Sequence, residues 1–134
     1  MQTMCLSVRQ PRAASIVSGA QRTERRTWYT SYRGALSIYS PRKADGPFLA
    51  AATRLGRERR ERGVVIGVVE LVDCVGSFDT GYALVLARPR AFDEPMTLPF
   101  RVMTKFFELE IPDALVAGGG YGPFRRPSPS SRSA

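Results

Sequence analysis

The sequence predicts an α+β fold, a small and mostly antiparallel β-barrel with two helices and a disordered C-terminal tail. Extended apolar segments recur between short loops, and two other segments carry apolar residues at helical spacing. The C-terminal end is rich in Gly, Pro, Ser and Arg, a composition that cannot offset chain entropy by burying apolar surface. We therefore expect one barrel domain at residues 1–117 and a disordered tail at 118–134.

Two helices are expected in the first half of the chain. The first is predicted at residues 11–18, because proline is tolerated at the first helical position and Gly19 follows where a helix would end. The second is predicted at 47–62, where apolar residues recur at helical spacing before Gly63.

The strands follow from alternation and from continuous apolar runs. Predicted strands are residues 22–28, 35–40, 64–75, 82–87, 96–102 and 105–111. The run at 64–75 is nearly continuous in Val, Ile and Leu, which is typical of a strand buried on both faces, and Gly67 inside it indicates a bulge. Arg88-Pro89 is expected to end the strand at 82–87.

Composition excludes several kinds of site. The chain has no histidine, which excludes histidine triads, histidine-bound zinc and an imidazole base. Cys5 and Cys74 can form at most one disulfide, and a reduced cytoplasmic chain is the simpler interpretation. No apolar run approaches the roughly 18–20 residues that cross a bilayer. We therefore predict no cofactor, no metal and no membrane partner, and a cytoplasmic location.

The charge balance is strongly basic. Lys and Arg number 20 against 12 Asp and Glu, the formal charge is +8, and Lys43 and Lys105 are the only lysines. A surplus of this size attracts polyanions, and the planar guanidinium group suits phosphate. A GC-rich genome explains the same bias towards arginine, and the sequence alone does not separate the two explanations.

The segment at 22–28 carries the most chemical information. Alternation places Glu24, Arg26 and Trp28 on one face of the predicted strand. Facing a cleft, they supply an acceptor, a bidentate donor and a stacking surface, which suit a nucleobase. Facing the interior, they form a structural ion pair beneath a core tryptophan. Both interpretations stay open at this stage.

The first forty residues contain a set of signature residues: Arg9-Gln10-Pro11, Gly19, Glu24, Arg26, Trp28 and Tyr32-Arg33-Gly34. With these residues the segment resembles the opening of an ASCH domain (activating signal cointegrator homology), a family in the PUA-like superfamily of β-barrels. The resemblance extends over about residues 4–115, because the segments GVVIGVVELVDCV and YALVLARPRAFDEP are similar to later strands of the family.

This resemblance implies a cleft beside the first helix and binding of RNA or modified nucleosides. We therefore predict a module that binds single-stranded RNA or a nucleoside. The residues expected to contact the ligand are Arg9, Gln10, Gln21, Glu24, Arg26, Trp28, Tyr32 and Arg33. For Tyr32-Arg33-Gly34, a role as a simple turn is the structural alternative.

The resemblance also raises an enzymatic alternative, because some relatives hydrolyse acetylated cytidine and others cleave RNA. Hydrolase relatives use a motif lysine and a threonine, which are Gln21 and Glu24 in this chain. A glutamine cannot act as a general base. We assign no catalytic residue, and Glu24 is the candidate that a hydrolase of modified nucleosides or a ribonuclease would need.

Overall fold

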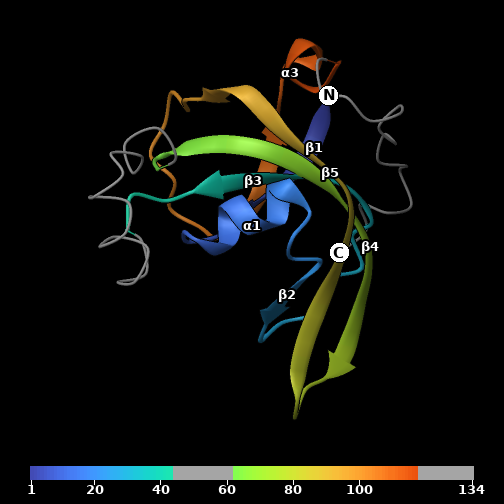
Figure 1. Cartoon of the computed structure of the whole chain (residues 1–134). Helices are drawn as coiled ribbons and strands as arrows, with labels where there is room; N and C mark the ends of the chain where they lie inside the picture. The colour runs from blue at the N-terminus through green and yellow to red at the C-terminus, as the bar shows by residue number, and fades with distance from the viewer. Residues whose placement is uncertain (44–61, 118–134) are drawn as a thin grey trace.

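The computed structural model describes residues 1–43 and 62–117. Six strands form one mixed sheet in the order β2-β5-β4-β3-β1-β6 (Figure 1). The elements are β1 (Gln2–Ser7), α1 (Arg12–Ser18), β2 (Thr23–Arg26), β3 (Gly34–Ser40), β4 (Val64–Ser77), β5 (Gly81–Met96), β6 (Phe106–Glu110) and α3 (Asp113–Ala117). Strands β1 and β3 are parallel, and the other four pairings are antiparallel.

The sheet is strongly curved, and a helix lies against each of its faces. The long hairpin of β4 and β5 bends around α1, while α3 lies near the other end of the sheet (Figure 1). Adjacent residues of one strand enter different cores: Leu6 joins the cluster that contains α1, and Cys5 joins the cluster that contains Val116 of α3. Strand β4 contributes to both clusters, which confirms the prediction of a strand buried on both faces.

Within residues 1–43 and 62–117, the structure does not show the hydrogen-bonded closure that the predicted β-barrel requires. Among the described strands, β2 and β6 end the sheet, and no ladder joins them. Aromatic packing brings these two ends together instead. Trp28, which follows β2, lies against Phe106 at the start of β6, with ring centroids 5.1 Å apart. The two edges of the curled sheet therefore approach each other at this aromatic pair.

Strand β1 was not among the predicted strands. Its residues Gln2–Ser7 lie between β3 and β6, so both edges of the strand are paired. The pattern is hard to recognise because Thr3 occupies a buried position. The Thr3 hydroxyl hydrogen-bonds the Ser37 hydroxyl at 2.9 Å and donates to the Leu109 carbonyl at 2.8 Å. Tertiary partners thus replace the apolar side chain that alternation requires.

Strand β5 continues through Arg88-Pro89, so the prediction that it ends there is wrong. Ala87 pairs with Glu70 and Arg90 pairs with Val68, which leaves two residues of β5 opposite one of β4. Arg88 has a φ of 50°, as expected where a strand bulges. Proline is tolerated at a bulge because no ladder hydrogen bond needs its missing N–H group.

The predicted strand at 96–102 is also wrong, because only Met96 belongs to a strand. Residues 97–105 form a loop, and Pro99 inside it has no N–H group for a ladder. The first helix is confirmed at Arg12–Ser18, one residue later than expected, and α3 was not predicted. The predicted tail, and the predicted helix at 47–62 up to residue 61, lie outside the described residues.

Cys5 gives the fold a testable pH dependence. Burial raises the pKa of its thiol to about 12, against an ordinary value of 9.0, and hydrogen bonds from Ser37 and Tyr39 offset only part of this. Above its ordinary pKa the unfolded thiol loses its proton while the folded thiol keeps it. Stability therefore falls as the pH rises from about 9 towards 12. Urea unfolding across this pH window should show a flatter dependence for Cys5→Ala than for the parent, and equal slopes would contradict the prediction.

Candidate functional site

A cavity of about 550 Å³ lies where the two sheet edges approach, beside the start of α1. This volume is in the range that accommodates a small molecule such as a nucleoside. Its lining comes from segments far apart in the sequence: Ser7, Arg9, Arg12, Glu24, Arg25, Arg26, Thr27, Trp28, Pro41, Lys43 and Lys105. Sequence analysis expected four of these, Arg9, Glu24, Arg26 and Trp28, and the structure brings them together.

Glu24 lies in the cavity wall and pairs with two of the arginines that line it. Its carboxylate is 1% exposed and accepts hydrogen bonds from Arg12 at 3.0 Å and from Arg26 at 3.1 Å, both at Oε2. Gln21 Nε2 donates to the other oxygen at 2.9 Å. A carboxylate has about four acceptor positions, so these three donors occupy most of them. Glu24 is therefore placed to hold guanidinium groups in fixed orientations.

Arg26 is the more buried of the two arginines, with 11% of its side chain exposed against 44% for Arg12. Burial lowers the pKa of Arg26, while the charge and hydrogen bond of Glu24 raise it again. In the described part of the chain, both hydrogen bonds of the Arg26 side chain come from Nη2, to Glu24 and to the Ser7 carbonyl at 2.9 Å. A guanidinium has five N–H donors, so Nη1 and Nε keep donors for a ligand.

Trp28 both packs on the core and lines the cavity. Its ring contacts Phe106 and belongs to the rim of the larger apolar cluster, yet it is only half-buried. Arg9 also lines the cavity and is exposed. The cavity thus combines an aromatic surface with an accessible cation.

Gln21 lies behind Glu24 and does not line the cavity. Its amide donates to the Glu24 carboxylate and, at 2.8 Å, to the Thr23 carbonyl. The position that carries the motif lysine in hydrolase relatives therefore holds a neutral donor to Glu24. Gln21 contributes to the orientation of the carboxylate rather than to the wall of the cavity.

Two other expected ligand residues stabilise backbone. Gln10 is fully buried, and its Oε1 accepts the N–H of Ala14 at 3.0 Å in the first turn of α1. Tyr32 is 4% exposed, and its hydroxyl donates to the Ala35 carbonyl at 2.6 Å. The structure does not bring either side chain into the cavity.

Arg33 also lies outside the cavity, in the loop before β3. It donates to the carbonyls of Thr30 and Tyr32, both at 2.8 Å, and forms an ion pair with Asp73 at 3.5 Å. The next residue, Gly34, has a φ of 139°, which favours glycine. Arg33 therefore fixes the backbone of the loop that leads into β3, and Gly34 is the first residue of that strand.

Comparison with known proteins identifies the family. Residues 6–95 match the ASCH domain. The chain belongs to the ASCH domain family. This confirms the resemblance inferred from the signature residues at the start of the sequence.

Relatives of this ASCH domain include much longer proteins. Activating signal cointegrator 1 of Homo sapiens is 39% identical over 82 residues, which cover 53% of this chain and 14% of that protein. The protein of the same name from Mus musculus is 38% identical over the same length and coverage. The chain therefore corresponds to a small part of these relatives.

A solved structure supports the fold. The crystal structure of a mutant of the ZmASCH protein from Zymomonas mobilis matches with a TM-score of 0.57 and 17% identity. The match covers 88% of this chain and 99% of that one. At this identity the similarity establishes a shared fold.

Several cavity residues were not expected from the sequence. Alternation assigns Arg25 and Thr27 to the face opposite Glu24. Thr27 follows the end of β2 at Arg26, where strict alternation ends, whereas Arg25 lies within β2 and still lines the cavity. Lys105 reaches the cavity from the loop before β6, and no local pattern relates it to β2. Arg12 was not among the expected ligand residues, although it pairs with Glu24. The one feature of the sequence that could have indicated these cavity residues was composition, because Lys43 and Lys105 are the only lysines of the chain.

The described residues contain neither a cluster of metal ligands nor a membrane-spanning helix. Across 1–43 and 62–117, no three or more His, Cys, Asp or Glu side chains gather in a way that could hold a metal ion. No helix within those ranges is long and apolar enough to cross a membrane. Cys5 and Cys74 are both free and buried.

Proposed function

We propose that this ASCH domain binds single-stranded RNA or a nucleoside in the cavity beside α1. One observation carries the proposal: six basic side chains and Trp28 line the cavity, against one carboxylate that is already hydrogen-bonded. Proteins that hold single strands combine a basic groove with aromatic surfaces on which bases stack. The cavity has both parts, in a volume that suits one nucleotide.

The residues divide into two roles under this proposal. Arg9, Arg12 and Arg26 donate to phosphate or to a base edge, and Trp28 provides the stacking surface. Glu24 keeps Arg12 and Arg26 oriented, and its remaining acceptor position suits an exocyclic amine of a base. Orienting donors before binding lowers the entropy lost when the ligand is held.

Titration of Trp28 fluorescence tests the proposal. We expect saturable quenching with cytidine derivatives or with short single-stranded RNA, because Trp28 is the only tryptophan and lines the cavity. Quenching that fades steeply with salt indicates phosphate-led binding, whereas quenching that barely responds indicates a pocket for a base. If neither ligand quenches Trp28 fluorescence even at high concentration, the proposal is contradicted.

Arg9→Ala separates binding from folding. Arg9 is exposed and lines the cavity, so its removal should leave thermal unfolding unchanged while weakening binding several-fold. Arg22→Ala is the matched control, because Arg22 is also exposed but does not line this cavity. Equal effects of the two variants would mean that general positive charge, not this site, binds the ligand.

A second candidate function is hydrolysis of a modified nucleoside or of RNA. The observation in its favour is that both lysines of the chain line the cavity. A lysine amine can exchange a proton that an arginine retains. Lys105→Arg keeps the charge, so an enzyme that uses this amine would lose turnover but not binding. Absence of acetate or nucleotide release at high protein concentration would remove this candidate.

A further inference from the structure

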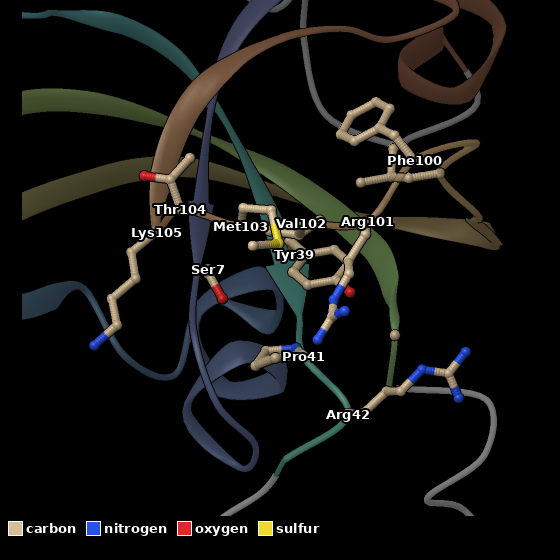
Figure 2. Close-up of a pocket in the computed structure, with 12 residues that line it drawn as sticks. Ser7, Tyr39, Pro41, Arg42, Phe100, Arg101, Val102, Met103, Thr104 and Lys105 are labelled. Carbon is tan, nitrogen blue, oxygen red and sulfur yellow. The ribbon is translucent and has the colours of Figure 1, made fainter.

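A second cavity, of about 650 Å³, adjoins the first. Its lining consists of Ser7, Tyr39, Pro41, Arg42, Gly63, Leu98, Phe100, Arg101, Val102, Met103, Thr104 and Lys105. Ser7, Pro41 and Lys105 line both cavities, so the two spaces meet along these residues. Most of the remaining wall comes from the loop at 97–105 (Figure 2).

The loop presents apolar side chains to solvent at this cavity. Phe100 is 50% exposed and Met103 is 79% exposed. The Phe100 ring is not loose, because it packs edge-to-face on Phe107 with centroids 6.2 Å apart and an interplanar angle of 81°. A partly fixed, solvent-facing ring is the surface on which an unpaired base stacks. The first cavity offers Trp28 in the same role.

The charge of the second cavity matches that of the first. Arg42, Arg101 and Lys105 line it, and none of its described lining residues carries a carboxylate. Figure 2 shows Arg101 and Lys105 extending from the loop on either side of Met103. Together, the linings of the two cavities contain eight basic side chains and one carboxylate, that of Glu24. A continuous basic path of this kind follows a phosphate backbone rather than a single anion.

We propose that the second cavity binds the nucleotide next to the one held at Trp28, with Phe100 stacking its base and Arg101 contacting its phosphate. The preferred ligand is then a single-stranded oligonucleotide of at least two nucleotides, not a free nucleoside. This inference rests on the proposed function of the first cavity. It adds a subsite formed by a loop that lies outside the signature residues.

A length series of oligocytidylates tests the inference on the full chain. Affinities for cytidine 5′-monophosphate, the dinucleotide and the tetranucleotide are measured by Trp28 quenching and by anisotropy of labelled oligomers. We expect at least a tenfold gain from one to two nucleotides, which is about the contribution of one stacked base. A gain below twofold would overturn the second subsite.

Variants in the loop at 97–105 test which residues provide the gain in affinity from the second nucleotide. Phe100→Ala should remove most of the tenfold gain and leave binding of the mononucleotide unchanged. Phe78→Ala is the matched control, because Phe78 is 89% exposed at the β4–β5 turn and does not line the cavity. Arg101→Ala should reduce the slope of log affinity against log salt by about 0.7, the value for one phosphate contact on a single strand. Arg22→Ala should leave that slope unchanged.

An abasic dinucleotide separates stacking from charge. If Phe100 stacks the second base, loss of that base lowers affinity as Phe100→Ala does, and the two changes together lower it no further. Equal competition by inorganic polyphosphate or by an oligo-aspartate peptide would overturn the inference, since neither has a base. Mononucleotide binding without a length effect leaves the first cavity intact and removes the second subsite. No binding of any probe removes both proposals.

Discussion

Replacing Glu24 with Gln is expected to lower the free energy of unfolding by about 3 kcal/mol, the usual effect of removing one partner of a buried ion pair. The substitution keeps the shape of the side chain but removes its charge. Arg26, with 11% of its side chain exposed, then loses the anion that compensates its burial. Arg12 is 44% exposed, so water takes over much of its stabilisation.

Urea unfolding of Glu24→Gln and of a control measures this effect. Glu94→Gln makes the same chemical change at an exposed position of β5 and should alter stability by less than about 0.5 kcal/mol. Arg12→Gln should fall between the two, because it breaks a partly exposed pair. If Glu24→Gln unfolds like the parent, the carboxylate does not stabilise the fold, and its role is confined to ligand binding.

Stability and binding must be separated at this carboxylate. Glu24→Gln is also expected to weaken ligand binding, because Arg12 and Arg26 lose their common acceptor. Arg9→Ala should weaken binding at unchanged stability, since Arg9 is exposed. Together the two variants distinguish a cavity damaged by partial unfolding from one that has lost a direct contact.

Sequence patterns predicted the parts of the fold that local chemistry dictates. Helix α1 and strand β4 follow from apolar spacing, and Gly67 indicated a bulge that the pairing register confirms. Strand β1 was missed because Thr3 takes its polar partners from β3 and β6, which no local window contains. The strand predicted at 82–87 was shorter than β5, because β5 accommodates Pro89 in a bulge and continues beyond it.

The candidate site divides in the same way. Alternation placed Glu24 and Arg26 together, and the resemblance added Arg9. The sequence left open whether Glu24 and Arg26 are structural or face a cleft, and in the structure they form a part-buried ion pair that lines a cavity. Lys105 and the loop at 97–105 reach the cavities only because the sheet curls, a property of the whole fold.

The second large effect is expected from Gly67→Ala, which should lower the free energy of unfolding by about 3 kcal/mol, at the upper end for overpacking a core. A Cβ atom at this position would lie 2.5 Å from the Arg90 carbonyl oxygen and 2.7 Å from Cγ1 of Val17. The first contact is with backbone of the neighbouring strand, and the second is with α1. Glycine therefore allows the helix to approach the sheet.

Two variants locate the source of this strain. Val17→Ala combined with Gly67→Ala removes the contact with Cγ1 but keeps those with the Arg90 carbonyl and with Cβ of residue 17, so we expect partial recovery relative to the sum of the single changes. Val72→Ala, at an exposed position of β4, serves as the control. Because α1 follows Arg9 and begins at Arg12, displacement of the helix also moves two cations of the cavity. Gly67→Ala should therefore weaken ligand binding even where the domain stays folded, whereas normal binding would mean that α1 keeps its position.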